Sequence, residues 1–196
     1  DSFFDSLRAS YPEFNEWYNK KAAAGATAYC YYVDNELKDF LYLKIEEEEL
    51  SDLTPALPAK KRLKVGTFKV DNDNRHTTRG ERFMKKIMDM AIAEDVDEIY
   101  VTMFPTEELQ GLIRMFEKFG FSHIADKPHE GGNAEYVLIK DMATHVDDFK
   151  LDYPFVKKAS SNKYVLSIVP EFHTHLFPDS ILKNEKKYDL IQDVSE

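Results

Sequence analysis

The stretch from Leu63 to Phe104 constrains the fold more than any other part of the sequence, because its hydrophobic pattern changes twice. Leu63 to Val70 is a short apolar and β-branched run that predicts a strand. Apolar residues recur at helical spacing from Thr78 to Glu94, and Glu98 to Phe104 is again a short apolar run typical of a strand. A strand, a helix and a strand in this order form a right-handed crossover between parallel strands. The sequence therefore predicts a sheet that contains a parallel pair.

The segments on either side of this unit predict further helices and strands. They are two short helices within residues 2–24, with Pro12 in the first turn of the second; strands at Thr27–Val33 and Leu37–Ile45 around an Asp34-Asn35 turn; a helix from Pro105 to Lys118 that stops at Gly120; and strands at Phe121–Ala125 and Glu135–Lys140. This order predicts an α/β (α+β) domain with a mixed central sheet over residues 1–141. We expect residues 142–196 to form a C-terminal extension packed on that core.

Charge and cysteine content narrow the classes of partner. The chain has 196 residues, with 36 acidic and 26 basic side chains and a formal charge of −10. Such a balance disfavours nucleic acid or an anionic membrane as the main partner. The single cysteine, Cys30, cannot form an internal disulfide, and we expect it to be buried. No apolar run is long enough to span a bilayer and no secretory signal is visible, so we expect a cytoplasmic protein.

The junction between the Leu63–Val70 strand and the following helix is the clearest candidate binding site. The first turn of a helix has unpaired N–H groups and partial positive charge, so it binds phosphate readily. Arg75, Arg79 and Arg82 concentrate positive charge there in an otherwise acidic chain. Either these arginines surround an anionic ligand or they only solvate a surface turn. Neither a P-loop nor a dinucleotide-binding fingerprint is present.

Two motifs resemble the GNAT superfamily of acetyl-coenzyme A-dependent N-acetyltransferases. Arg75-His76-Thr77-Thr78-Arg79-Gly80 is similar to the family's phosphate-binding signature, with Thr78 in place of its first glycine. Phe116-Glu117-Lys118-Phe119-Gly120-Phe121 resembles the end of a later helix in the same family. The resemblance covers residues 2–140, and the Pro170–Pro178 stretch is similar to one in a bacterial subgroup. The family's opening strand is not visible before Ser2, which is consistent with a missing segment.

The resemblance implies a cofactor, a site and a reaction. In this family two parallel strands splay apart, and the pantetheine of acetyl-CoA pairs with the first of them. The corresponding residues here are Phe68, Lys69 and Val70, with a backbone N–H near Val70 polarising the acetyl carbonyl. The pyrophosphate would be held by the loop and helix start, namely Arg75, His76, Thr77, Thr78, Arg79, Gly80 and Glu81. The implied reaction is direct transfer of an acetyl group to a primary amine on a cationic acceptor, either a small molecule or a peptide.

No residue is assigned a catalytic role by the sequence. Family members commonly have a tyrosine acid where this chain has Phe116, and phenylalanine carries no proton. Four residues on flanking strands are possible contributors, although each fits an ordinary strand position: Glu98, Tyr100, Glu135 and Tyr136. A non-catalytic CoA-binding or protein-interaction module, within a larger protein, is therefore the alternative function.

Two other groups of residues have unremarkable interpretations. His173 and His175 have the spacing of a metal-binding pair but no obvious third ligand, so we expect no metal. Glu46–Glu49 could attract a cationic substrate, but a solvated strand end is the simpler interpretation.

Overall fold

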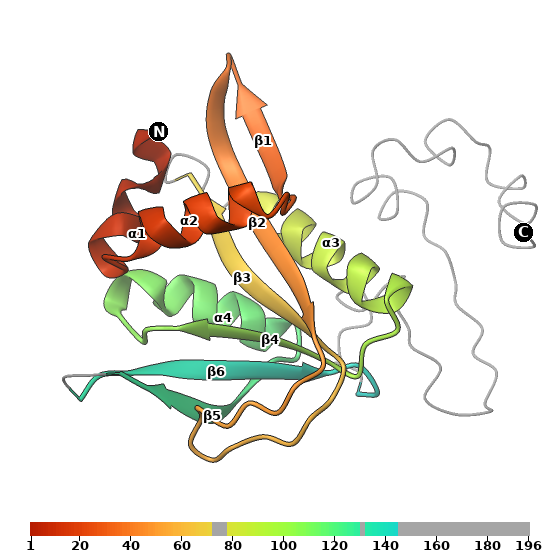
Figure 1. The fold of residues 1–196 in the computed structure, drawn as a ribbon. Helices are drawn as coiled ribbons and strands as arrows, with labels where there is room; N and C mark the ends of the chain where they lie inside the picture. Colours follow the sequence, from red (N-terminus) through yellow and green to blue (C-terminus); the bar gives the residue numbers. More distant parts are fainter. Residues whose placement is uncertain (72–77, 130–131, 145–196) are drawn as a thin grey trace, which may run out of the picture. The chain divides into compact units, whose positions relative to one another are not determined.

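The computed structural model describes residues 1–71, 78–129 and 132–144. They form a six-stranded sheet with the order β1-β2-β3-β4-β6-β5, shown in Figure 1. The strands are β1 (Tyr29–Val33), β2 (Glu36–Glu46), β3 (Arg62–Val70), β4 (Glu98–Met103), β5 (Ser122–Pro128) and β6 (Ala134–Asp141). The helices are α1 (Asp5–Ser10), α2 (Phe14–Ala23), α3 (Arg79–Ala93) and α4 (Gln110–Lys118), with short 3-10 turns η1 (Ser2–Phe4) and η3 (Glu107–Leu109). Neighbours are antiparallel except β3 and β4, which run parallel, so the predicted mixed sheet is confirmed.

Local turn chemistry sets two boundaries where the sequence predicts them. Asp34 and Asn35 both have positive φ, as the tight turn of the β1–β2 hairpin requires. Gly120 has φ +87° and ends α4; the N–H of Phe121 then donates to the carbonyl of Phe116 over 3.1 Å. This is the helix-ending bond of a Schellman motif. The second motif of the sequence is therefore a helix cap.

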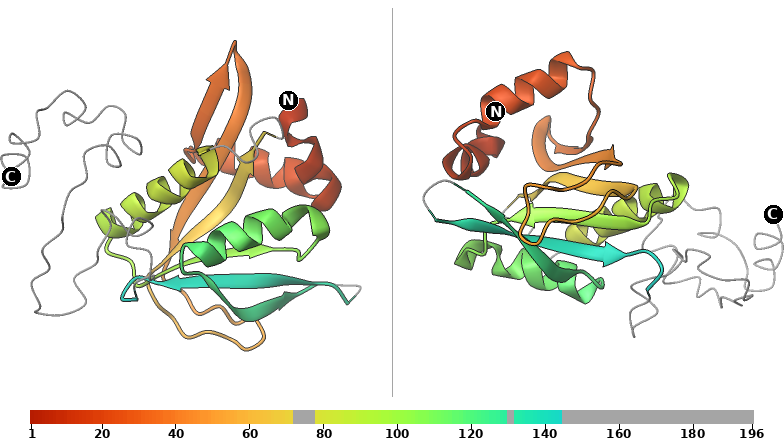
Figure 2. Two further views of the ribbon diagram at one scale, coloured as in Figure 1. Left: turned by 180° about the vertical axis from the view of Figure 1, so that it is seen from behind. Right: turned by 60° about the horizontal axis from the view of Figure 1, so that its bottom comes forward.

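The sheet separates two apolar layers, because successive residues of a strand point to opposite faces. Leu41 and Leu43 of β2 belong to the main core, which also contains the buried faces of α3 and α4. Phe40 and Tyr42 belong to a second cluster with Phe4, Phe14 and other residues of α1 and α2. Figure 2 shows the two helix pairs on opposite sides of the sheet. A third cluster lies under the loop after β2, where Leu50 and Leu53 cover Tyr100 and Val137.

Three expectations differ from the structure. Pro12 lies outside the second helix, which begins only at Phe14. Cys30 is exposed, because β1 is an edge strand whose first four residues are all solvent-accessible. The fourth helix begins as a 3-10 turn at Glu107 instead of at Pro105.

Other expectations concern residues beyond the described part. Apart from its first three residues, the expected extension at 142–196 lies outside the described residues, as do His173, His175 and the Pro170–Pro178 stretch. Within the described ranges, no helix is long and apolar enough to cross a membrane.

Candidate functional site

The parallel pair stops half-way along its strands. β3 and β4 pair only from Arg62 with Glu98 to Val65 with Val101. Each strand then continues with its other neighbour: β3 follows β2 to Val70, and β4 follows β6 to Met103. Figure 1 shows the two strands diverging from the corner where they pair. No strand in the described part of the chain therefore pairs with residues 66–70 of β3 on the side that faces β4.

A bulge at Gly66 explains where the strands part. Tyr42 of β2 pairs with Thr67 and Leu43 pairs with Val65, so Gly66 is an extra residue in β3. A bulge bends its strand and increases the local twist, which turns β3 away from β4. A Cβ atom at Gly66 would lie 2.7 Å from Cδ1 of Tyr42, so only glycine fits without a shift.

Helix α3 begins at Arg79, nine positions after Val70, the last residue of β3. Its N-cap, Thr78, makes no side-chain cap hydrogen bond, so the N–H groups of the first turn are not used by a capping side chain. Thr78 has φ −71°, a value that a residue with a Cβ adopts without strain. The threonine in place of the family's glycine is therefore compatible with this backbone.

Three features of the described residues together decide the fold. The sheet is mixed and has the strand order given above, its parallel pair separates at a bulge, and a helix begins after the strand that carries the bulge. The described residues form a GNAT-like fold. No family model matches the sequence, and no curated protein matches it.

Three solved structures are examples of chains that are similar to this one. One is Arabidopsis thaliana Naa50 in complex with a bisubstrate analogue of CoA and a peptide, at 20% identity over 64% of this chain and 80% of that chain, with a TM-score of 0.45. Another is Ard1 from Thermoplasma volcanium, at 14% identity over 69% and 75%, with a TM-score of 0.46. A third is the NatC complex bound to Gag peptide and CoA, at 15% identity and a TM-score of 0.44; that match covers 57% of this chain and 65% of that chain, less than two thirds. At such identities the similarity concerns the fold and assigns no activity.

The three expected cofactor-binding residues of β3 contact different parts of the structure, and Phe68 is the one that packs against α3 and α4. The ring of Phe68 packs edge-on against Phe83, with centroids 5.5 Å apart, and against Phe116 at 5.6 Å. Lys69 points to the other side, with its Nζ 5.1 Å from the ring centroid of Phe3 and hydrogen-bonded to Ser6. Val70 is half-buried and pairs with Asp39. Lys69 therefore joins the end of β3 to η1 and α1.

The arginines predicted to form a basic region at the start of α3 differ in their contacts. Arg79 Nη1 lies 3.4 Å from Asp39 Oδ2, and its guanidinium carbon lies 4.4 Å from the ring centroid of Tyr31. Burial raises the pKa of the Asp39 carboxyl, and the Arg79 charge opposes that rise. Arg82 is exposed, and Arg75, His76 and Thr77 lie outside the described residues. Arg79 thus joins the helix start to the β1–β2 hairpin.

Gly80 and Glu81 connect α3 to α4. A Cβ on Gly80 would lie 2.9 Å from the sulfur of Met115, so glycine lets the helices approach closely. Glu81 Oε1 pairs with Lys118 Nζ at 3.2 Å. Phe116, at the position where the resemblance implied a tyrosine acid, has no exposed surface and packs against Phe121 with ring centroids 4.9 Å apart. Its ring cannot donate a proton.

Glu46 differs from the expected solvated strand end, since only 7% of its side chain is exposed. Tyr100 donates a hydrogen bond to Glu46, Lys44 Nζ lies 2.9 Å from it, and Lys64 Nζ lies at 3.8 Å. Burial raises the pKa of Glu46, but the hydrogen bonds from Lys44 and Tyr100 outweigh it and leave the pKa below its usual value. Burial also lowers the pKa of Lys64 and raises that of Tyr100. Glu47, Glu48 and Glu49 are exposed as predicted.

A second polar group lies at the far end of β4, and the sequence did not reveal it. Tyr11, in the turn between α1 and α2, donates a hydrogen bond to Glu135 of β6 over 2.7 Å. His129 Nε2 lies 3.0 Å from the other carboxylate oxygen of Glu135. Phe104, which directly follows β4, packs against Tyr11 and His129 with centroid distances of 5.6 and 5.2 Å. Tyr11 and Glu135 are 124 positions apart, so only strand order brings them together.

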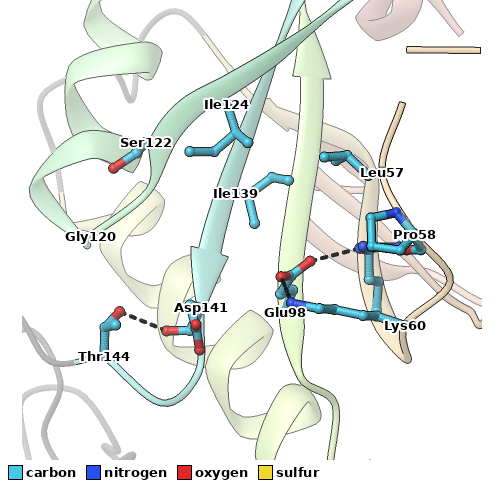
Figure 3. Close-up of a pocket in the computed structure, with 11 residues that line it drawn as sticks. Leu57, Pro58, Lys60, Glu98, Gly120, Ser122, Ile124, Ile139, Asp141 and Thr144 are labelled. Carbon is cyan, nitrogen blue, oxygen red and sulfur yellow. Dashed lines mark hydrogen bonds and ion pairs between the residues drawn. The ribbon is translucent and has the colours of Figure 1, made fainter. Parts of the chain in front are cut away.

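A pocket of about 380 Å³ lies at the opposite end of β4 and is shown in Figure 3. Glu98 bridges Lys60 and the buried Arg62 there, with 2.8 Å between Arg62 Nε and Glu98 Oε2. Arg62 also donates to the carbonyl of Pro58 over 2.9 Å. These contacts join the loop after β2 to the first residues of β3 and β4, where the two strands are still paired. The pocket is therefore separate from the gap between them.

No metal site is found in the ranges that the structure describes, where no three His, Cys, Asp or Glu side chains are grouped to hold an ion. Of the four strand residues considered as catalytic contributors, Tyr100 and Glu135 each belong to a hydrogen-bonded group on the sheet face away from α3 and α4. Glu98 is part of the ion pairs with Arg62, and Tyr136 packs against the main core.

Proposed function

We propose that this chain binds acetyl-CoA between β3 and β4 and transfers its acetyl group to a primary amine. The observation that supports this most directly is that β3 continues through residues 66–70 after its pairing with β4 has ended at Val65, and then leads toward the start of α3. Pantetheine contains two amide groups, so it can pair with such an edge as a further strand does. The pyrophosphate then meets the uncapped first turn of α3.

The residues proposed to bind acetyl-CoA lie on two elements that follow each other in the chain. Phe68, Lys69 and Val70 offer the strand edge, and Thr78, Arg79, Gly80 and Glu81 the helix start. Arg75, His76 and Thr77 would complete the phosphate site. A backbone N–H near Val70 would polarise the acetyl carbonyl, a type of contact whose loss in other enzymes costs about 3–4 kcal/mol. Bound acetyl-CoA supplies the activated thioester.

The acceptor is expected to be cationic. The chain carries a formal charge of −10, which attracts positively charged substrates. Glu46 and Glu135 place two buried carboxylates on the sheet face that α1, α2 and the loop after β2 cover. Because no side chain in the described part is suited to carry an acyl group at the gap, we propose direct transfer within a ternary complex.

Phe116 supports a second candidate, a CoA-binding module without catalytic activity. The ring is fully buried and has no acidic proton, so it cannot protonate a leaving thiolate. An active enzyme must take that proton from water or from another side chain.

Calorimetric titration with acetyl-CoA tests both candidates, and two matched glycines make the test specific. Gly80 and Gly111 are each the second residue of their helix. Gly80→Glu places a negative charge at the proposed phosphate site while remaining compatible with a helix N-terminus. Gly111→Glu makes the same change at the start of α4, where a Cβ meets no atom within 4 Å.

We expect Gly80→Glu to weaken acetyl-CoA binding at least about 10-fold, equivalent to about 1.4 kcal/mol, and Gly111→Glu to leave it unchanged. Gly80→Ala measures the part of any loss that comes from displacing Met115. Absence of wild-type binding would refute both candidates, and unchanged affinity in Gly80→Glu would show that the phosphate site lies elsewhere. If binding is present, thiol release from acetyl-CoA with trialanine, spermidine and kanamycin decides between them: turnover supports the enzyme, and silence with all three supports the module.

A further inference from the structure

One buried carboxylate in the described part of the chain differs from the others in its partners. Four carboxylate side chains are at most 11% exposed there, and three of them have a lysine or arginine within 4.0 Å: Asp39, Glu46 and Glu98. Glu135 is 5% exposed, and the basic group beside it is the imidazole of His129. A buried negative charge is costly unless a positive charge or hydrogen bonds compensate it. Glu135 is therefore held by its hydrogen-bond contacts with Tyr11 and His129, and its charge favours the approach of a cation from outside.

The position of this group relates it to the proposed reaction. Phe104 directly follows β4, beyond the part of that strand that pairs with β3, and its ring packs against both Tyr11 and His129. Glu135 and Val137 point to one face of β6, and Tyr136 between them points to the other face, toward α3 and α4. Glu135 therefore lies on the sheet face away from these two helices. The group thus lies beyond the end of β4, on the sheet face that carries the two buried carboxylates Glu46 and Glu135.

His129 has one ring nitrogen bonded to Glu135 and a partly exposed side chain. Its backbone N–H donates to the carbonyl of Asn133 over 2.9 Å, which anchors the residue at the end of β5. Nε2 lies 3.0 Å from Glu135, while 36% of the side chain is exposed. When Nε2–H donates to the carboxylate, Nδ1 is the unprotonated nitrogen and can accept a proton. Tyr11 donates to the other oxygen of Glu135 and holds the carboxylate in place.

We propose that His129 is the general base that deprotonates the acceptor's ammonium group, with Glu135 and Tyr11 as positioning residues. This inference rests on the proposed acetyltransferase function. The aromatic rings of Tyr11 and Phe104 beside a carboxylate form a surface suited to an alkylammonium group. The substrate class is therefore an alkylamine that is protonated at neutral pH.

The step balances as follows for the acceptor R–NH₃⁺. One proton moves from nitrogen to Nδ1 of His129, and the freed lone pair attacks the thioester carbonyl carbon. A C–N bond forms and the C–S bond breaks, with the bonding electron pair leaving on sulfur. The second nitrogen proton is carried by water to that sulfur, so the products are the acetamide, CoA-SH and protonated His129, which releases its proton to solvent.

The charged groups around His129 are few in the described residues. From β6 it faces Glu135, and from the α1–α2 turn the phenol of Tyr11 lies on the same carboxylate. β4 contributes the uncharged Phe104, and Lys127 on β5 pairs with Asp52 at 3.0 Å. Burial and the hydrogen bond to Glu135 raise the pKa of Tyr11, so its hydroxyl remains a donor. Within this cluster the imidazole of His129 is thus the side chain with a nitrogen that can accept a proton.

His129→Gln tests the proposal, and His123→Gln is its matched control. His123 lies on β5, the strand that His129 directly follows; its side chain is 39% exposed, and its Nε2 lies 2.8 Å from the carboxylate of Asp126. Acetyl-CoA-dependent thiol release is measured from pH 6 to about pH 10 with whichever of trialanine, spermidine and kanamycin wild type acetylates fastest. We expect His129→Gln to lower kcat/KM about 100-fold at neutral pH, with acetyl-CoA affinity unchanged, and His123→Gln to match wild type.

The pH profile separates a base from a merely structural residue. The loss in His129→Gln is expected to shrink as pH rises to about 10, the usual pKa of an alkylamine, because about half of the substrate or more is then neutral without a base. Glu135→Gln keeps the size of the buried side chain and is expected to show a smaller loss of the same pH dependence. A His129→Gln enzyme with wild-type kcat/KM, or with a loss that is equal at every pH, refutes the inference while leaving the proposed function intact. No turnover by wild type with any of the three amines refutes the enzymatic function, and the inference with it.

Discussion

Replacing Gly66 by alanine tests the reasoning that a bulge opens the gap between β3 and β4. The added Cβ would lie 2.7 Å from Cδ1 and 3.1 Å from Cε1 of Tyr42, closer than van der Waals contact permits. The Tyr42 ring cannot simply turn away, because it is 8% exposed and packs edge-on against Trp17 with centroids 5.5 Å apart. Either the ring or the bulge must therefore move.

Two opposing effects set the change in the free energy of unfolding of Gly66→Ala. Overpacking a buried contact costs about 1–3 kcal/mol. Removing a glycine returns about 0.4–1 kcal/mol by reducing the freedom of the unfolded chain, since the backbone of Gly66 is not left-handed. The free energy of unfolding should therefore fall by about 1–2 kcal/mol, equivalent to about 2–8 °C in Tm for a chain of this size.

Urea unfolding of Gly66→Ala gives this free energy, and a double-mutant cycle with Tyr42→Leu assigns its cause. If the clash with the ring is responsible, the two changes together should be about 0.5–3 kcal/mol less destabilising than the sum of the single variants. Gly111→Ala is the control, since a Cβ there meets no atom within 4 Å. A Gly66→Ala protein as stable as wild type, or a loss that Tyr42→Leu does not relieve, would refute the steric account of the bulge.

Two further predictions concern buried charges. Glu98→Gln should lower the free energy of unfolding by about 3–5 kcal/mol, because it leaves the buried Arg62 guanidinium without its carboxylate. Lys60→Met should change that free energy by less than about 1 kcal/mol, because the Lys60 side chain is 42% exposed. Equal losses of the two variants in urea unfolding would contradict this. Tyr100→Phe should cost about 1.5–3 kcal/mol at neutral pH by removing a hydrogen bond to the ionised Glu46. Because the pKa of Glu46 is lower in the folded state than in the unfolded chain, its contribution is present above the unfolded pKa and lost as pH falls through the folded one. The wild-type advantage over Tyr100→Phe in thermal unfolding should therefore shrink on acidification below about pH 4, and an advantage that stays constant there would argue against an ionised Glu46.

The order of helices and strands could be predicted because its signals are local. Alternation over Leu63–Val70 and helical spacing over Thr78–Glu94 each arise within one element. The hairpin turn at Asp34 and the helix end at Gly120 follow from residues that accept positive φ. Boundaries shifted by a few residues, as at Pro12 and Pro105, where a single proline suggested an earlier helix start than the backbone makes.

The candidate site could be predicted only in part. The motif around Gly80 identified the helix start, since it is a contiguous stretch of sequence. The sequence did not show that Arg79 turns to Asp39 or that Glu46 is buried against Tyr100, because both contacts cross from one element to another. Cys30 was expected inside from its residue type, but its strand lies at the edge of the sheet.

The sequence by itself determined which segments become helices and strands, where they turn, and that one pair of strands runs parallel, because spacing and turn chemistry act over a few neighbouring residues. Only the tertiary structure decided where that pair parts, since the bulge at Gly66 depends on its register with Tyr42. It also brought Tyr11 to Glu135 across 124 positions, through a strand order that no local pattern contains. The physical reason is that register and strand order are set by packing between distant segments.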